Sequence, residues 1–415
     1  MKYQFNKIVV VGLGYIGLPT AAIIASRGIK VTGVDINKSA VNTINKGKIH
    51  IEEPELDVVV HGAVASGMLK ASTTPESADA FIVAVPTPFK DDHMPDLSYI
   101  EAAAKAIAPV LDKNNIVILE STSPVGTTEQ LSHWLAEMRD DLSFPHNGGV
   151  EADIQIAYCP ERVLPGRILV ELIDNDRIIG GLTQECAKKA QQLYKLFVSG
   201  DCILTDARTA EMTKLVENAF RDVNIAFANE LSIVCEKLDI DVWELIKIAN
   251  RHPRVNVLQP GPGVGGHCIA VDPWFIVSAA REETKLIQAA RYINDQKPYY
   301  VTEKAVAAAR ELNESVIACF GMSFKANIDD LRESPAVQIV ANLAQMGFRL
   351  LVVEPHIKEL PGSLSKYSNI ELVSEDIAIL NANILLLLVD HDDFKQIDAA
   401  KLKEKTVIDT RGIWQ

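Results

Sequence analysis

Strand-like and helix-like patterns of hydrophobic and polar residues follow one another regularly through the N-terminal half of the chain. Short apolar runs, each long enough for one strand, lie at 7–11, 81–89 and 116–122, and the stretch from 154 begins as a strand and becomes a polar loop. Longer segments with helical spacing of apolar residues separate these runs. Nearly continuous apolar strands of this kind are typical of a parallel sheet whose two faces are covered by helices.

From 205 to about 238 the rhythm changes to one helical period without proline or glycine, with a Thr or Asp available to cap its start. Such a helix is on the order of 50 Å long, enough to join two domains and to carry a subunit interface. After Pro298 the alternation returns, with strands expected at 316–321, 350–355, 384–390 and 406–412 and a helix at about 334–347.

The pattern therefore predicts an α/β protein in which two Rossmann-like, doubly wound parallel-sheet domains are joined by a long central helix. We place the first sheet domain at 1–204 and a helical region, which also contains a candidate catalytic cysteine, at 205–305. The second sheet domain is placed at 306–415.

The first strand runs directly into the sequence GLGYIG, which predicts a dinucleotide site. Gly12 permits a tight turn, Gly14 lets a pyrophosphate approach the backbone, and Gly17 lets the helix pack closely on the strand. The helix N-terminus then offers N–H groups to the phosphates. Asp35 closes the second strand, where a carboxylate binds the adenosine ribose and repels a 2′-phosphate. NAD is thus favoured over NADP, although Lys38 nearby works against that preference.

The C-terminal strands form a loose repeat of the N-terminal ones. Gly321 falls where Gly12 falls, and Glu354 falls where Asp35 falls, but the second copy carries MSFKANIDDLRES in place of the glycine fingerprint. This domain is therefore expected to bind something other than a dinucleotide. Lys325 and Arg332 suggest a phosphate-bearing ligand, and two surface cations on a loop are the alternative interpretation.

Composition narrows the class of protein. The 415 residues are 48% hydrophobic, enough for buried cores, and the net charge of −14 argues against nucleic acid or an anionic membrane as a partner. The six cysteines show neither C-x-x-C pairs nor a zinc-like histidine spacing, so we expect no metal site and a reducing, cytoplasmic location. The longest aliphatic run, 384–389, is too short to span a bilayer.

The segment QPGPGVGGHCIAVDPW places Cys268 behind four glycines. Glycines allow close backbone approach and left-handed turns, and a cysteine after such a turn at the start of a helix is in a setting that favours a nucleophilic thiol. An inert cysteine in a packed loop is the alternative. Asp272, one helical turn later, is a candidate to orient water or accept a proton, or is simply a charge at a helix N-terminus.

Further polar residues gather around this chemistry. Lys214, Asn218 and Arg221 share one face of the long helix, as donors for an oxyanion or a sugar hydroxyl or as a solvated stripe. Basic residues at 251, 252 and 254, together with Glu161 and Arg162, are candidates for a cradle that holds a diphosphate. A cysteine between two phosphate-ligand sites is useful when an aldehyde must be trapped, oxidised again to a thioester and hydrolysed. That sequence is a four-electron oxidation consuming two NAD.

The chain resembles the UDP-glucose/GDP-mannose dehydrogenase family over essentially its whole length. The matching pieces, each modest alone and specific in their order and spacing, are GLGYIGLP, VPTP, ESTSPVGTT, CPERVLPG, the K-x-x-x-N of the long helix, GVGGHCIAVDP, FKANIDDLRESP and DTRG.

This resemblance implies Cys268 as nucleophile, Lys214 as the acid/base that stabilises the oxyanion beside Asn218, and Asp272 as a helper in hydride transfer or hydrolysis. It places Thr122 and Glu161 at the water-handling side of the site. The implied cofactor contacts, beside the three glycines, are Tyr15, Ile16, Asp35, Thr87 and Thr128. The implied contacts of the UDP-sugar, together with Lys214 and Asn218, are Arg162, Val163, Arg221, His252, Arg254, Gly265, Lys325, Arg332 and Arg411. A homodimer through the long helix is implied as well, with some of these residues acting from the neighbouring subunit.

One departure concerns the sugar. UDP-glucose dehydrogenases usually carry GGSCFPKD around the cysteine, whereas this chain has His267 and Val271 in place of the serine and the lysine. The segments NRHPRVNVLQPGPG and DTRGIWQ resemble the branch of the family that oxidises UDP-N-acetylmannosamine at C6 for bacterial surface polysaccharides. A sibling activity on UDP-N-acetylglucosamine, UDP-N-acetylgalactosamine or UDP-glucose stays open. So do a non-catalytic NAD- and sugar-binding regulator and a two-electron hydroxyacid dehydrogenase.

Overall fold

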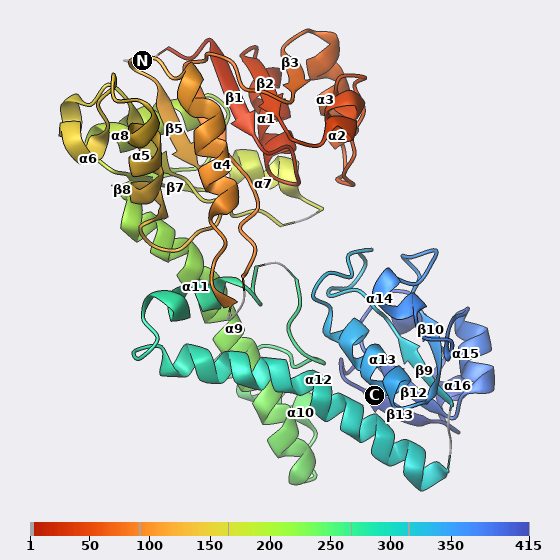
Figure 1. Cartoon of the computed structure of the whole chain (residues 1–415). Coiled ribbons are helices and arrows are strands. Elements are labelled where there is room, and N and C mark those ends of the chain that lie inside the picture. Colours follow the sequence, from red (N-terminus) through yellow and green to blue (C-terminus); the bar gives the residue numbers. More distant parts are fainter. Residues whose placement is uncertain (1–3, 91–92, 165, 267, 314–315, 415) are drawn as a thin grey trace. The chain divides into compact units, whose positions relative to one another are not determined.

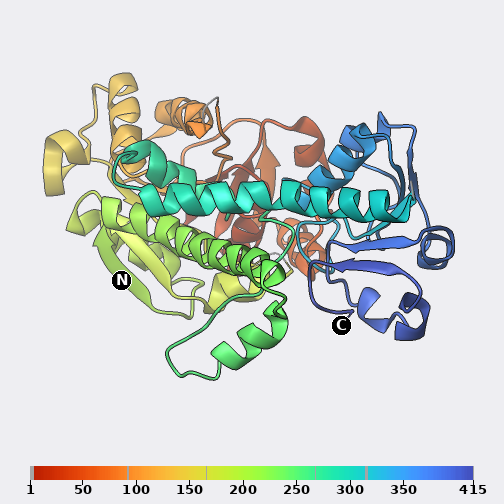
Figure 2. The same cartoon turned by 90° about the horizontal axis from the view of Figure 1, so that it is seen from below.

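A computed structural model describes residues 4–90, 93–164, 166–266, 268–313 and 316–414. The chain divides into two compact units, the first formed by Met1–Val216 and Trp274–Ala279 and the second by Glu217–Pro273 and Ala280–Gln415 (Figures 1 and 2). Within the described residues, none of the helices is both long and apolar enough to cross a membrane.

The first unit is built on an eight-stranded sheet with the order β3-β2-β1-β4-β5-β6-β7-β8. Its strands are β1 Lys7–Val11, β2 Lys30–Val34, β3 Leu69–Ser72, β4 Ala80–Val83, β5 Ile116–Leu119, β6 Gln155–Tyr158, β7 Arg177–Gly181 and β8 Cys202–Asp206. The first six follow the order of a doubly wound dinucleotide-binding sheet, confirming the predicted fold class.

One part of the sheet differs from the all-parallel expectation. β7 pairs with β6 in the antiparallel sense, with Tyr158 opposite Gly180, while β7 and β8 are parallel to each other. Large doubly wound sheets commonly carry such an antiparallel margin. Strand periodicity reports burial and not direction, so the sequence pattern could not distinguish the two.

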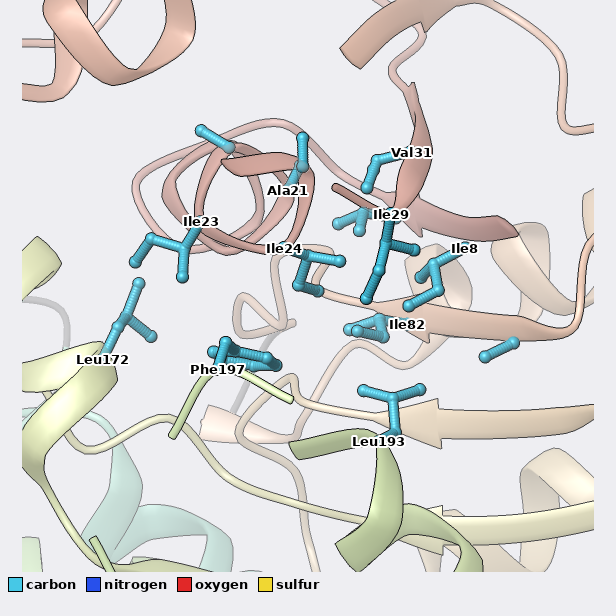
Figure 3. Close-up of a cluster of buried hydrophobic side chains, with 14 of the residues drawn as sticks. Ile8, Ala21, Ile23, Ile24, Ile29, Val31, Ile82, Leu172, Leu193 and Phe197 are labelled. Carbon is cyan, nitrogen blue, oxygen red and sulfur yellow. The ribbon is translucent and has the colours of Figure 1, made fainter. Parts of the chain in front are cut away.

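Helices cover both faces of this sheet because alternate strand residues point to opposite sides. Ile8 and Val10 of β1 join one buried cluster, whereas Val9 and Val11 join the other. Figure 3 shows the first cluster, in which Ile23 and Ile24 of α1 meet side chains from the strands and from α7 and α8. The helices of this unit are α1 Gly17–Ser26, α2 Lys38–Ile44, α3 Leu56–Ala65, α4 Ser98–Ile107, α5 Thr127–Met138, α6 Pro145–Gly148, α7 Ile168–Asp174 and α8 Gln184–Tyr194.

The predicted long helix is confirmed as α9, Ala207–Lys237. Asp206 caps it, since its carboxylate accepts the Thr209 backbone N–H at 2.9 Å. The other helices before the second sheet are α10 Val242–Ala249, α11 Asp272–Ala279 and α12 Lys285–Leu312. Helix α12 continues through Pro298, where we had expected the strand–helix rhythm to resume. The predicted domain boundaries at 204/205 and 305/306 fall within β8 and α12.

The second unit contains a five-stranded parallel sheet of order β11-β10-β9-β12-β13, which repeats the order of the first five strands of the large sheet. Its strands are β9 Val316–Phe320, β10 Arg349–Val353, β11 Ile370–Leu372, β12 Ile384–Leu387 and β13 Thr406–Asp409. Its helices are α13 Pro335–Gln345, α14 Gly362–Ser365, α15 Glu375–Asn381 and α16 Ala399–Leu402.

The predicted repeat extends to single residues. Gly12 and Gly321 both have φ of 92°, and each donates its N–H at 2.8 Å to the last residue of the neighbouring strand, Val34 or Val353. The two sheets therefore share one strand-end geometry, although only the first retains the glycine fingerprint.

Candidate active site

The three fingerprint glycines lie in different surroundings, as the sequence predicts. A side-chain carbon on Gly12 would lie 2.4 Å from the Ala84 carbonyl oxygen, and one on Gly17 would lie 1.8 Å from the Gly12 carbonyl oxygen. A side-chain carbon on Gly14 meets no heavy atom of the described residues within 4 Å. Gly12 and Gly17 are thus required by the protein's own packing, whereas Gly14 leaves open space of the kind a pyrophosphate needs.

Asp35 stands beside this loop at the carboxyl end of β2. One carboxylate oxygen accepts the Leu13 N–H at 2.9 Å and the other accepts the Asn37 N–H at 2.8 Å. The carboxylate is therefore fixed next to the glycine turn and is only partly buried. Tyr15 and Gly14 are exposed at the same turn, and Ile16 is half-buried. This donor and acceptor set fits a dinucleotide.

The predicted threonines differ in how accessible they are. Thr87 is half-buried and donates its hydroxyl to the Thr122 carbonyl at 2.5 Å. Thr128 is fully buried, and its N–H and hydroxyl both donate to Glu211, at 2.7 and 2.6 Å. The second Glu211 oxygen accepts the Gly126 N–H at 2.6 Å. The Thr128 side chain is thus engaged with α9 in this structure. Glu211 was missed in the sequence, although it lies one turn before Lys214.

Glu161 is half-buried near the positive charge of Lys214 within the first unit. Burial raises the pKa of Glu161, and the positive charge of Lys214 partly opposes that rise. Lys214 is 6% exposed, which rules out a solvated stripe at this position of α9. The Val163 N–H donates to the Glu161 carboxylate. A carboxyl group whose pKa is raised toward neutrality is suited to proton transfer.

Behind Glu161 lies a buried polar cluster that the sequence analysis did not identify. Tyr194 donates its hydroxyl to Glu120 at 2.7 Å, and the Arg177 guanidinium stands 5.6 Å from the centre of the Tyr194 ring. Burial raises the pKa of Glu120, while Arg177 opposes the rise and Glu161 adds to it. Arg177 comes from β7 and Tyr194 from α8, whereas Glu120 directly follows β5. Of the three, only Glu120 gave a sequence signal, as the first residue of ESTSPVGTT.

Within the second unit, Asn218 donates its side-chain amide to Asp272 at 2.5 Å. Asn218 is 6% exposed and Asp272 is 2% exposed, so Asp272 is more than a solvated helix charge. The Asp272 N–H in turn donates to the Cys268 carbonyl at 2.8 Å, and Cys268 itself is exposed. The structure therefore brings Asn218, Asp272 and Cys268 together. Helix α11 begins at Asp272, so Cys268 lies in the preceding turn and not at the helix start.

Other parts of the chain occupy the space beside the glycines that precede Cys268. A side-chain carbon on Gly261 would lie 2.5 Å from the Arg411 guanidinium, and one on Gly265 would lie 2.5 Å from the Glu333 carbonyl oxygen. The Phe324 ring stands 3.0 Å from the corresponding position at Gly266. Close intrachain packing thus surrounds Gly261, Gly265 and Gly266. The left-handed turns that the sequence predicts are present at Gly263 and Gly266, with φ of 149° and 84°. His267 lies outside the described residues.

The predicted substrate-binding cations are distributed unevenly. Arg411 is held by Asp390, to which its Nε donates at 2.8 Å, and it lies against Gly261. Arg332 makes a two-pronged ion pair with Asp330, at 2.8 and 2.6 Å. Arg162 donates to the Asp176 carbonyl at 3.2 Å, in the first unit. Other predicted contacts are exposed at the surface of α9 and of the loops. They are the side chains of Arg221, Arg254 and Lys325 and the imidazole of His252.

Glu354, the counterpart of Asp35, anchors the loop that carries Lys325. It accepts the Met322 N–H at 2.7 Å and the His356 N–H at 3.1 Å, and it faces His391 Nε2 at 3.1 Å. Glu354, His356 and His391 lie close enough together to hold a metal ion. However, His391 Nδ1 already accepts the Asn327 N–H at 2.9 Å, so both ring nitrogens are engaged. The group is better described as a clamp on the loop.

Sequence models of a single family match almost the whole chain. They are the NAD binding domain of the UDP-glucose/GDP-mannose dehydrogenase family over residues 6–198, its central domain over 208–296 and its UDP binding domain over 318–415. The first unit thus carries the NAD-binding domain that the glycine fingerprint predicts.

Individual proteins agree with this assignment. The chain is 64% identical to an NDP-N-acetyl-D-galactosaminuronic acid dehydrogenase of Ralstonia nicotianae, covering 99% of this chain and 97% of that protein. It is 63% identical to a UDP-N-acetyl-D-mannosamine dehydrogenase of Campylobacter jejuni, covering 96% of this chain and 98% of that protein. The solved structure of a UDP-D-ManNAc dehydrogenase from Pyrococcus horikoshii superposes with a TM-score of 0.88 at 37% identity. The match covers 99% of this chain and 96% of that one. The chain belongs to the UDP-glucose/GDP-mannose dehydrogenase family.

Proposed function

We propose that the protein oxidises the C6 hydroxyl of UDP-N-acetyl-D-mannosamine to a carboxylate in two successive NAD-dependent steps. The Campylobacter jejuni relative supports the sugar, because its name specifies that substrate and its identity of 63% extends over 96% of the chain. The observation that supports the chemistry most directly is the buried pair of Asn218 and Asp272. The Asp272 backbone N–H donates a hydrogen bond to the Cys268 carbonyl.

The cofactor would be held by the open backbone at Gly14, the neighbouring Tyr15 and Ile16, the Asp35 carboxylate and Thr87. When bound, NAD accepts the hydride that leaves C6 in each oxidation. Asp35 is already fixed by two backbone N–H groups, so it would meet the ribose hydroxyls without reorganising.

Cys268 would act after the first oxidation. Its sulfur forms a bond to C6 of the aldehyde while the aldehyde oxygen takes up a proton, giving a thiohemiacetal. Removal of the C6 hydrogen as hydride and of the hydroxyl proton then leaves a thioester on Cys268. Water adds to C6, the C–S bond breaks, and the carboxylate product departs as the thiol regains its proton.

The remaining residues would manage charge and water. Lys214 stabilises the oxyanion beside Asn218, and Asp272 helps to orient or deprotonate the attacking water. Glu161, whose pKa burial raises, accepts or returns a proton on the side of Thr122. The UDP moiety would meet Arg162, Val163, Arg221, His252, Arg254, Gly265, Lys325, Arg332 and Arg411.

A second candidate substrate is UDP-N-acetyl-D-galactosamine. The Ralstonia nicotianae relative is named for the corresponding uronic acid, and its identity of 64% matches that of the mannosamine enzyme. The test is NADH formed per mole of sugar at completion, with UDP-N-acetylmannosamine, UDP-N-acetylgalactosamine, UDP-N-acetylglucosamine and UDP-glucose run side by side. Two NADH from UDP-N-acetylmannosamine alone would support the proposal. Two NADH from another sugar alone would keep the chemistry and replace the substrate.

Cys268 is tested by replacement. Cys268→Ala should form no uronate, and Cys268→Ser should perform at most the first oxidation or stall as a covalent adduct, followed by mass spectrometry of the intact protein. Full uronate production by Cys268→Ala would remove the thioester from the mechanism. No NADH from any of the sugars, with NAD and UDP-sugar binding intact, would instead favour the regulator.

We also propose a homodimer through α9. Val216, Phe220, Phe227 and Val234 lie at helical spacing and are 46, 69, 55 and 45% exposed, an apolar stripe that a second copy would cover. Sedimentation velocity of Phe227→Glu should show monomers if the stripe is the interface, with Tyr292→Glu on the exposed face of α12 as the control substitution. An unchanged dimer in Phe227→Glu would place the interface elsewhere.

A further inference from the structure

A continuous chain of buried hydrogen bonds connects α9 to α12 in the second unit. Asp222 accepts from Arg291 at 2.6 Å and from the Asn294 amide at 2.8 Å, and Asn294 accepts from the Asn229 amide at 2.9 Å. These four residues are between 0 and 2% exposed, and the two helices, which cross in Figure 1 and run alongside each other in Figure 2, are joined by these bonds. Burying so many polar groups is costly unless each is satisfied.

The chain of bonds does not end between the helices. The Asn229 side-chain oxygen accepts the Gly261 N–H at 2.9 Å, and Gly261 is buried at the beginning of the glycine-rich loop. On its other side Gly261 lies against the Arg411 guanidinium, which is itself held by Asp390 at 2.8 Å. Asn229 therefore fixes one end of the loop to the helix pair.

The other end of the loop carries Cys268. Between the two ends, the Phe324 ring closes over Gly266 and the Glu333 carbonyl closes over Gly265. Beyond the loop, the Cys268 carbonyl accepts the Asp272 N–H. The short segment from Gly261 to Cys268 is thus held at its beginning by an amide in the helix interior and at its end by the turn into α11.

We propose that Asn229 and Asn294 are positioning residues for Cys268. Asn229 holds the Gly261 backbone directly. Asn294, whose amide is oriented by Asp222, fixes the Asn229 amide so that its oxygen faces Gly261. Neither residue touches the reacting atoms. The inference rests on the proposed role of Cys268 as nucleophile, and it assigns to this buried network the task of setting where the sulfur lies.

A purely structural role is the competing explanation, in which the network only selects the pairing of α9 with α12. The two explanations differ in what Asn229→Leu and Asn229→Asp do. Leucine removes the acceptor for the Gly261 N–H, whereas aspartate keeps an acceptor there and loses only the donor to Asn294. If the network serves packing alone, the buried charge of aspartate should be the more damaging change. If it positions the loop, aspartate should retain more activity than leucine.

The experiment measures three quantities on the full-length enzyme: kcat for NADH formation, the melting temperature, and the alkylation rate of Cys268 by iodoacetamide, followed by peptide mass spectrometry. Thr302→Val is the matched control, because Thr302 is 2% exposed and its hydroxyl donates within α12, to the Pro298 carbonyl at 2.8 Å. We expect Asn229→Leu to lower kcat by about ten- to a hundredfold and to change the alkylation rate severalfold, with NAD affinity unchanged. Thr302→Val should alter only the melting temperature.

Asn294→Ala gives the same test one bond further from the loop, and it decides the matter if Asn229→Leu does not fold. Values of kcat and alkylation rate equal to those of Thr302→Val, or a lower kcat for aspartate than for leucine, would overturn the inference. Its failure is distinguishable from that of the proposed function, because an active Cys268→Ala variant would refute the nucleophile regardless of Asn229.

Discussion

Replacing Gly14 and Gly17 separately by alanine should separate an effect on NAD affinity from an effect on protein stability. The two glycines are three positions apart in one fingerprint, yet their surroundings differ. An added methyl group at Gly14 enters open space, whereas at Gly17 it would lie 1.8 Å from the Gly12 carbonyl oxygen. Gly14→Ala should therefore act on the ligand, and Gly17→Ala should act on the protein.

The magnitudes follow from these distances. Carbon and oxygen atoms rarely approach closer than about 3 Å without a large repulsion, so α1 would have to move away from β1 by about 1 Å in Gly17→Ala. Overpacking of this kind costs about 1–3 kcal/mol and lowers Tm by about 2–12 °C for a domain of this size. Gly14→Ala should change stability by no more than about 0.5 kcal/mol. It should weaken NAD binding by at least about tenfold, or about 1.4 kcal/mol.

The assay is a thermal melt of each variant without ligand, followed by calorimetric titration with NAD in the absence of sugar. Gly62→Ala is a suitable control, since a methyl group there also meets no heavy atom of the described residues within 4 Å and the position lies outside the fingerprint. Wild-type NAD affinity in Gly14→Ala would refute the assignment of Gly14 to the pyrophosphate. A wild-type Tm in Gly17→Ala would refute the packing argument.

Three further outcomes depend on ionisation. Because burial raises the pKa of Glu161 above 4.5, kcat should fall as the pH drops through that raised value, and Glu161→Gln should lack this acid limb in a pH–rate profile. Burial lowers the pKa of Lys297 from 10.5 to about 8. Between pH 8 and 10.5 the unfolded chain therefore keeps a proton on Lys297 that the folded protein has lost. As the pH rises through this range, the wild-type free energy of unfolding should increase by about 3 kcal/mol relative to that of Lys297→Met, measured in urea melts. Burial alone would raise the pKa of Glu354, but hydrogen bonds from His391 and the Met322 N–H lower it. Glu354→Gln should thus be about 1.5–3 kcal/mol less stable at neutral pH, and calorimetric scans should show this deficit disappearing as the pH falls below 4.5.

Local features were the ones that sequence reasoning predicted well. The turn at Gly12, the acidic residue at the end of the second strand and the long helix each depend on residues close together in the chain, where periodicity and glycine placement are informative. The correspondence of Gly321 with Gly12 was also accessible, because both copies keep the same strand–turn–helix spacing. These predictions are confirmed.

Features that join distant segments were not predictable in the same way. Asp222 and Arg291 are 69 positions apart, and a buried charge pair has the same letters as a solvated one. The direct bond between Asn218 and Asp272 joins two residues that had been considered separately. For the glycines before Cys268 the sequence predicted close approach and left-handed turns, but it could not name Phe324 and Arg411 as the neighbours that pack against them. A glycine signals that something comes close but does not identify it. The roles proposed for the individual site residues stay predictions.

The carboxylate at the end of the second strand has a consequence for redesign of cofactor preference. Asp35 and Glu354 accept backbone N–H groups in the same way, one beside a dinucleotide fingerprint and the other in a sheet without one. The acceptor role is therefore independent of the ribose contact, since it is present where the chain has no dinucleotide loop. Engineers who exchange Asp35 for a basic residue to admit NADP would remove a structural brace together with a selectivity filter. A short acceptor such as asparagine or serine at 35, with a positive charge introduced at Ile36 to act together with Lys38, would leave the brace in place.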